Sequence, residues 1–259
     1  MTRVVSGAVL IAIAIGVVWF APPLLFFAVA IAVAVIAVHE LIVLARAREL
    51  RLSTTAAAFA TSLVVGSSLV PQALDVFLVT AFIGAAATTL GAWRGGPDAL
   101  ATVSASLFPA IYVGLPIAAM VGIRTLAGPP ALFLLMLTII VSDSMQYYTG
   151  RLFGRRPLAP LVSPKKTIEG ATGGFVFGTA LFTIVGAWWL PAVPAGFRVL
   201  VGLTLVALGI AGDLFESMLK RSANVKDSSS LIPGHGGILD RIDALLFAAP
   251  VYYIVLRYV

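Results

Sequence analysis

The stretch that decides the class of fold is residues 197–218, FRVLVGLTLVALGIAGDLFESM. Its first sixteen residues contain a single charge, Arg198, and the run is long enough to cross the roughly 30 Å hydrocarbon core of a bilayer as a helix. Eight more runs of similar length and hydropathy lie at 4–21, 24–45, 54–71, 73–92, 104–123, 130–149, 170–190 and 238–257. We therefore expect an all-α integral membrane protein, a polytopic bundle of about nine transmembrane helices.

The composition excludes a separate water-soluble domain. Of the 259 residues, 60% are hydrophobic and 11% are charged, whereas soluble globular chains carry about 25% charged residues. We expect a single transmembrane domain over 1–259, with a helical N-terminal part, 1–130, and a catalytic part, 131–259, that carries the loops 150–169 and 219–237. The first apolar run is longer than the core of a signal peptide, so we expect it to be retained.

Cysteine is absent and only two histidines occur, which excludes disulfides, thiolate metal sites and multi-histidine metal sites. The net charge is +6, and the positions of the basic residues along the chain are informative. Nine spans put thirteen lysines and arginines on the side of the N-terminus and only three on the other side. By the positive-inside rule, we expect the N-terminus and both basic loops at the cytoplasmic face of a bacterial-type inner membrane. The high mean hydropathy argues against a nucleic-acid partner.

Five acids lie in or beside the apolar runs, toward their cytoplasmic ends: Asp143, Asp213, Glu216, Asp240 and Asp243. An unpaired carboxylate at the bilayer centre costs about 2.5–3.5 kcal/mol, so these side chains need cations or hydration. Asp213 and Glu216 are three residues apart on one helix face, which Ser217 and Lys220 continue. Together with Asp240 and Asp243 they predict an all-oxygen site suited to Mg²⁺. The alternative is ion pairing, of Glu216 with Lys220 and of Asp240 or Asp243 with Arg241.

The loops supply the complementary cations. Ser163-Pro164 resembles a helix N-cap and first helical residue, and Lys165 and Lys166 beside a helix start predict a phosphate site. Residues 220–237 hold three more cations and a Pro-Gly-His-Gly-Gly turn, which suits a loop that closes over a polyphosphate. The alternatives are that Arg151, Arg155 and Arg156 follow from topology alone, and that the 220–237 loop is simply solvated.

Other motifs carry less chemistry. No Gly-Lys-Ser/Thr segment of a Walker A loop is present, and His39-Glu40 lacks the second histidine of a zinc-protease helix, which favours a polar pair at a helix end. Gly170, Gly174 and Gly178 recur every four residues, a stripe that indicates close packing of two helices.

The segments Ser217–Arg221, Lys226-Asp227 and Pro233–Asp243 together resemble the signature of the phosphatidate cytidylyltransferase (CDP-diacylglycerol synthase) family. Ser142-Asp143, Gly150–Gly154 and Ser163–Gly170 resemble other blocks of the same family, in the family's order. Residues 1–130 match it only in hydropathy and in helix count. Ser144-Met145-Gln146 departs from the small-residue stretch that the family usually has there.

The resemblance implies a nucleotidyltransferase that uses Mg²⁺ to make CDP-diacylglycerol and pyrophosphate from CTP and phosphatidic acid. It implies Asp213 and Asp240 as the first metal ligands, followed by Asp243, Glu216 and Asp143; a second monovalent or divalent cation is compatible with this set. The catalytic residues it implies are Asp213, Asp240, Asp243, Lys220 and Lys226. The substrate-binding residues it implies are Lys165, Lys166, Arg221, His235, Gly236, Gly237, Ser217, Arg241 and Arg151.

Two other functions are compatible with the sequence. A CTP-dependent polyprenol or phytol kinase would transfer the γ-phosphate and release CDP. A cation-coupled transporter would need acids near the membrane midplane, whereas these acids lie near helix ends. As partners we expect CTP, phosphatidic acid and membrane lipids, and a homodimer is compatible with the assignment.

Overall fold

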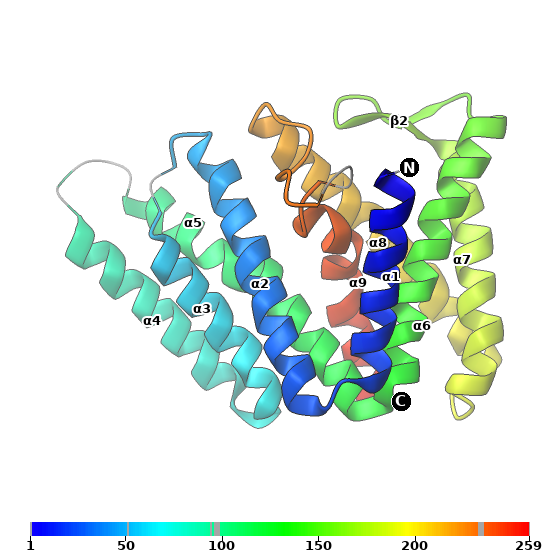
Figure 1. Ribbon diagram of the computed structural model, residues 1–259, viewed down its shortest axis with the longest axis horizontal. Coiled ribbons are helices and arrows are strands. Elements are labelled where there is room, and N and C mark those ends of the chain that lie inside the picture. Colours follow the sequence, from blue (N-terminus) through cyan, green and yellow to red (C-terminus); the bar gives the residue numbers. More distant parts are fainter. Residues whose placement is uncertain (1, 51, 94, 96–98, 233–235, 259) are drawn as a thin grey trace. The chain divides into compact units, whose positions relative to one another are not determined.

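The computed structural model describes residues 2–50, 52–93, 95, 99–232 and 236–258. Described residues are helical except for connecting turns and one two-stranded sheet (Figure 1). The chain forms two compact units, one of Met1–Gly122 with Ser222–Arg241 and the other of Ile123–Arg221 with Ile242–Val259. We call them unit 1 and unit 2. The predicted division into an N-terminal part and a catalytic part stays a prediction.

Unit 1 contains α1 (Thr2–Phe20), α2 (Pro23–Arg46), α3 (Thr54–Gly66), α4 (Leu74–Ala92), α5 (Ala99–Pro109) and the π-helical turn η3 (Ala110–Gly114). Two short 3₁₀ turns, Ser67–Leu69 and Pro71–Ala73, join α3 to α4. Proline at the first position of α2 and the Ser53 hydroxyl, which accepts from Ala56 N at 3.2 Å, start two of these helices. Both are local signals that the sequence carries.

Small side chains let the unit 1 helices approach one another. α3 packs against α2, α4 and η3, and Figure 1 shows α3 and α4 side by side. The residues buried at this contact are Ala60, Val64, Ala81 and Ala110. Alanine-rich contacts of this kind are typical of membrane helices, where packing rather than hydrophobic exclusion of water drives association.

Helix α6 (Leu115–Phe153) is interrupted at Gly128, whose φ of 79° lies in the left-handed region that favours glycine. Pro129 and Pro130 follow directly, so one helix ends at this point and a second begins. The two predicted spans 104–123 and 130–149 therefore fall on either side of a break for which glycine and two prolines are responsible.

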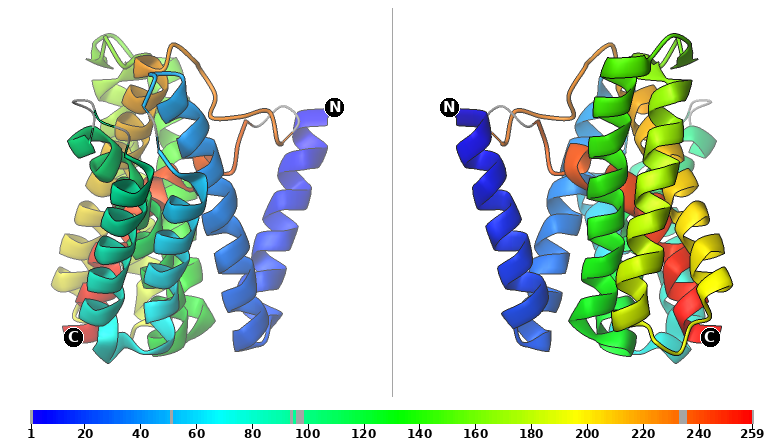
Figure 2. Two further views of the ribbon diagram at one scale, coloured as in Figure 1. Left: turned by 90° about the vertical axis from the view of Figure 1, so that its left-hand side faces the viewer. Right: turned by 90° about the vertical axis from the view of Figure 1, so that its right-hand side faces the viewer.

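Unit 2 contains the second part of α6, the hairpin strands β1 (Pro157–Ala159) and β2 (Ser163–Thr167), α7 (Ile168–Trp189), α8 (Ala195–Ser222) and most of α9 (Leu239–Tyr258). α6 and α7 run side by side in both views (Figures 1 and 2). The glycine stripe lies between them: a methyl group at Gly170 would be 2.7 Å from the Gln146 carbonyl oxygen, and one at Gly174 would be 3.0 Å from the Ser142 hydroxyl. The predicted role of this stripe in close helix packing is confirmed.

The predicted fold class is confirmed, since every predicted span coincides with helical residues. Among the described residues, five helical stretches are long and apolar enough to cross a membrane: Pro23–Arg46, Pro71–Ala92, Ala99–Phe153, Ile168–Trp189 and Ala195–Ser222. Large apolar side chains on α4 and α7, such as Phe82, Ile83 and Val176, are more than half exposed, as suits a surface that faces lipid. The protein is a membrane protein, and the number of nine crossings stays a prediction.

Replacing Gly178 by alanine should lower stability, because the added methyl would lie 2.7 Å from Cγ2 of Val206 on α8 and 3.1 Å from Cβ of Ser142 on α6. Overpacking of this kind costs about 1–3 kcal/mol. We expect a lower unfolding temperature in detergent for Gly178→Ala. Gly84→Ala is the control, because a methyl at Gly84 meets nothing within 4 Å. An unchanged midpoint for Gly178→Ala would contradict the close packing.

Candidate functional site

A cavity of about 370 Å³ lies within unit 2, where the end of α6, strand β2, the start of α7 and the end of α8 meet. Five of the residues predicted from the sequence line it: Asp143, Arg151, Lys165, Lys166 and Asp213. Gln146, Tyr147, Gly150, Thr167, Gly170 and Ala171 complete the described lining. The structure therefore brings cations of the first predicted loop together with two of the predicted acids.

Asp213 is neutralised by a lysine from the hairpin. Lys166 donates its ammonium to Oδ2 of Asp213, and their side chains are 22% and 26% exposed. The Ser217 hydroxyl lies 3.4 Å from Oδ1 of the same carboxylate, one turn further along α8. This pair joins residues 47 positions apart in the chain, and it holds a charged carboxylate and a charged amine together at the edge of the cavity.

Glu216 is fully buried on the same helix and pairs with Lys220, four residues later. The ion-pairing alternative thus holds for Glu216, as the i,i+4 spacing predicts. The expected shared face of Asp213, Glu216, Ser217 and Lys220 is present as contacts along α8. Whether Glu216 also binds a metal stays a prediction.

Gln146 lines the cavity, although the sequence indicated no role for it in the site beyond the departure at 144–146. Its side-chain nitrogen donates to Oδ1 of Asp143 at 3.0 Å and lies 3.3 Å from the Ser142 hydroxyl, so it holds the Asp143 carboxylate from one turn further along α6. The available signal was its position, three residues after Asp143 in the segment that departs from the family pattern.

The hairpin corrects one prediction. Ser163 does not cap a helix and Pro164 is not its first residue, because Ser163–Thr167 is strand β2, paired antiparallel with β1. The helix begins at Ile168, and Thr167 is the N-cap, with its hydroxyl accepting from Gly170 N at 3.1 Å. Pairing with β1 keeps 163–167 extended, and the next hydroxyl residue along the chain therefore caps the helix.

Two further contacts fold the hairpin back on unit 2. Oε2 of Glu169 accepts from the backbone N–H groups of Arg155 at 2.9 Å and Arg156 at 3.2 Å. Nε of Arg221, on α8, lies 3.4 Å from the Val162 carbonyl oxygen at the hairpin turn. The exposed guanidinium of Arg151 donates to the Tyr147 hydroxyl at 3.3 Å. Lys165 and Lys166 are thus carried by a hairpin that Glu169 holds at its base and Arg221 holds at its turn.

The second predicted loop belongs to unit 1, and Asp240 orders it. Oδ2 of Asp240 accepts from Ser228 N at 2.9 Å, the Ser228 hydroxyl at 2.8 Å and Gly237 N at 2.8 Å. Gly236 has a φ of 77°, and Ile232 N donates to its carbonyl at 2.8 Å. Lys226 is exposed. His235 lies outside the described residues.

The predicted acids of α9 are divided between the units. Asp240 and the exposed Arg241 belong to unit 1, whereas Asp213 and Asp243 belong to unit 2. α8 approaches α9 closely, because a methyl at Gly212 would lie 2.6 Å from the Asp243 carbonyl oxygen. Oδ1 of Asp243 accepts from Ala244 N at 2.7 Å. A metal shared by Asp213 and Asp240 stays a prediction.

The donors around the unit 2 cavity have the chemistry that a hard cation requires. Asp143 and Asp213 both line it and supply carboxylate oxygens, and Gln146 supplies an amide. Mg²⁺ prefers oxygen ligands and usually keeps several waters and substrate phosphates, so two carboxylates fit it. Among the residues that the structure describes, no three acidic or histidine side chains are grouped closely enough to hold a metal by themselves.

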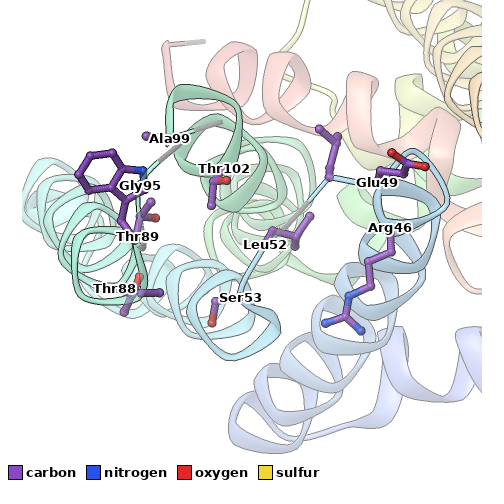
Figure 3. A pocket seen from close by; sticks show the side chains of 12 residues that line it. Arg46, Glu49, Leu52, Ser53, Thr88, Thr89, Gly95, Ala99 and Thr102 are labelled. Carbon is purple, nitrogen blue, oxygen red and sulfur yellow. The ribbon is translucent and has the colours of Figure 1, made fainter. Parts of the chain in front are cut away.

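A second cavity, of about 770 Å³, lies within unit 1 between the end of α2 and the helices α4 and α5 (Figure 3). Arg46 and Glu49 lie at one side of it, and Thr88, Thr89 and Gly95 at the other. The Arg46 guanidinium donates to the Thr54 hydroxyl at 2.7 Å. None of the residues predicted for metal or substrate binding is among its described lining residues.

Comparison with known proteins identifies the family of the chain. The model of the cytidylyltransferase family matches residues 1–259, so the chain belongs to this family. Phosphatidate cytidylyltransferase of Bacillus subtilis is 42% identical over 149 residues, which are 57% of this chain and 55% of that protein. The Thermotoga maritima enzyme of the same name is 41% identical over 161 residues, 60% of each chain. That of Aquifex aeolicus is 40% identical over 127 residues, 48% of this chain and 46% of the relative. The chain spans about half the length of these relatives, and the resemblance found in the sequence is confirmed.

Glu169 should protect the Arg155–Arg156 bond from trypsin, since its carboxylate accepts from both backbone N–H groups. Losing these hydrogen bonds should speed cleavage after Arg155 about five-fold in Glu169→Ala. Thr172→Ala, one turn further along the same helix, is the matched control. Equal cleavage rates in Glu169→Ala and the unmodified protein would show that the carboxylate does not order this loop.

Proposed function

We propose that the protein is a CTP:phosphatidate cytidylyltransferase that makes CDP-diacylglycerol and pyrophosphate in a bacterial inner membrane, with both loops at the cytoplasmic face. The observation that carries this proposal is the unit 2 cavity, where cations and carboxylates meet at the end of apolar helices. Membership of the cytidylyltransferase family and the names of the relatives support the choice of reaction.

The reaction joins two phosphates. An oxygen of the phosphatidate phosphate attacks the α-phosphorus of CTP and forms a new P–O bond, while the bond from that phosphorus to the oxygen bridging to the β-phosphate breaks. Pyrophosphate leaves with the electron pair. The attacking phosphate monoester is already anionic near neutral pH, so no general base is required. The protein has to position two polyanions and offset their repulsion.

The cavity side chains suit this task. Lys165 and Lys166, from the hairpin, and Arg151, from the end of α6, would contact substrate phosphates. Lys166 is held by Asp213, so its charge is fixed at the cavity edge rather than carried on a free side chain. The other substrate contacts that we propose are Ser217, Lys220, Arg221, Lys226, His235, Gly236, Gly237 and Arg241.

Asp143 and Asp213 would hold Mg²⁺ in this cavity, with Gln146 fixing the Asp143 carboxylate. When bound, the ion would neutralise the triphosphate and polarise its α-phosphate. Asp240, Asp243 and Glu216 remain proposed further ligands, and a second cation is compatible with them. We also propose membrane lipids as partners and a homodimer as the assembly.

The main competitor is a CTP-dependent lipid kinase. Its substrates would need the same cations, so the geometry of the cavity does not separate the two reactions. The family match and the names of the relatives favour cytidylyl transfer.

Two labels on CTP separate these reactions. The purified protein, given phosphatidate and Mg²⁺, should transfer ³²P from the α-position of CTP into the lipid phase and release γ-label as pyrophosphate. Label from the γ-position in lipid, with α-label recovered as CDP, would establish a kinase and refute the proposal. Phosphatidate omitted from the reaction is the control for exchange without acceptor.

Asp213→Asn should reduce kcat by about 100-fold or more and raise the Mg²⁺ concentration needed for half-maximal rate, because it removes a charge that holds Lys166 and that would hold the metal. Mg²⁺ titrations of Asp213→Asn and Asp143→Asn would measure this. Asp75→Asn, in the first turn of α4, is the control for a carboxylate outside the site. Full turnover of Asp213→Asn at ordinary Mg²⁺ would refute the assignment of this residue.

A further inference from the structure

Glu40 is a buried acid to which the proposed chemistry assigns no role. It lies in α2, six residues before the helix ends, and its side chain is buried, with the residue only 3% exposed. Such a group inside a membrane helix needs strong donors, since an unpaired buried charge is very costly. Its donors come from the other end of the chain, within unit 1.

Each oxygen of Glu40 accepts one serine hydroxyl and one backbone N–H. Oε1 accepts from the Ser229 hydroxyl at 2.7 Å and Ile238 N at 3.0 Å. Oε2 accepts from the Ser228 hydroxyl at 3.1 Å and Leu239 N at 2.8 Å. Leu239 is the first residue of α9. The carboxylate therefore caps α9 from a helix that is almost 200 residues earlier in the chain.

Asp240 is the second carboxylate that binds this part of the chain. It accepts from Ser228 N and Gly237 N, so the two ends of the 228–239 segment are held by both carboxylates. The Ser228 hydroxyl lies between the two carboxylates, which share its single proton. The space is full: a methyl group on Gly237 would overlap the Ser228 hydroxyl and Oε2 of Glu40. A methyl on Gly236 would lie 2.5 Å from Oδ2 of Asp240.

We propose that Glu40 is a positioning residue, which holds residues 228–229 next to residues 238–239 and thereby sets the placement of the substrate-binding residues Lys226, Gly236 and Gly237. This role rests on the proposed function, because those residues are substrate contacts only if the protein handles a nucleotide and a phospholipid. Glu40 touches no reacting atom. It acts by fixing the backbone that carries the residues that do.

The geometry makes glutamine an informative replacement. Because each carboxylate oxygen faces a backbone N–H, the amide group of glutamine must oppose one N–H in either orientation. The serine hydroxyls can reverse and adapt, but a backbone N–H cannot. Glu40→Gln should therefore speed hydrogen–deuterium exchange of residues 226–241 about ten-fold or more, and lower kcat/KM for CTP by a similar factor.

The test uses the full chain in detergent or nanodiscs. Exchange is measured across all peptides, and kcat and KM are measured for both substrates. Ser229→Ala, which removes one donor to Glu40, should give a smaller change of the same kind. Ser230→Ala is the matched control, because Ser230 is the exposed neighbour of the same residue type and should change neither measurement. If Glu40→Gln does not fold, Ser229→Ala and Gly237→Ala carry the comparison.

Faster exchange confined to 226–241, together with reduced kcat/KM, supports the positioning role. Exchange that rises equally in α2 and α3 would indicate a purely stabilising role and overturn the proposal. Faster exchange of the loop with unchanged kcat/KM would overturn it as well. If the unmodified protein does not make CDP-diacylglycerol, the proposed function is refuted. If hydrogen–deuterium exchange is unchanged in Glu40→Gln, the positioning role of Glu40 is refuted.

Discussion

A carboxylate on an apolar helix has to be supplied with positive charge or with several hydrogen-bond donors, and much of this structure follows from that requirement. Asp213 takes the ammonium of Lys166 from the hairpin, and Glu216 takes that of Lys220 from its own helix. Glu40 takes two hydroxyls and two backbone N–H groups from the segment before α9. The partners are different, but in each case the group that binds the acid, a lysine or a loop, is itself fixed in place.

Glycine residues determine how closely α7 approaches α6 and how closely residues 236–237 approach two carboxylates. Gly170 and Gly174 let α7 lie directly on the α6 turns that carry Gln146 and Ser142, which places the start of α7 and the end of β2 at one wall of the cavity. In the other unit, Gly236 and Gly237 leave room for the carboxylates of Asp240 and Glu40. A side chain at any of these four glycines would displace the neighbouring polar groups. The glycines are therefore required for the positions of these polar groups as well as for helix packing.

The same charges suit a reaction between phosphates. A lysine held beside a carboxylate keeps a defined position, which is what preorganised stabilisation of a polyanionic transition state requires. The hairpin is anchored by Glu169, at its own end, and by Arg221 from α8, and the 228–239 segment is anchored by Glu40 and Asp240, so each predicted loop has at least one contact from outside its own sequence. Order in these loops, rather than covalent chemistry by a side chain, is the contribution that the protein makes under the proposed function.

The sequence by itself determined the membrane class, the helical runs, the acids at their ends and the family, because hydropathy, charge placement and motif spacing are local properties of the chain. It also identified Asp143, Arg151, Lys165, Lys166 and Asp213, which line one cavity. Only the tertiary structure decided that Thr167 and not Ser163 caps α7, since pairing with β1 overrides a local capping signal. Only the tertiary structure revealed the roles of Gln146 and Glu40. The partners of Glu40 lie up to 199 residues away, and no periodicity or spacing within the sequence records which distant donors will meet a buried carboxylate.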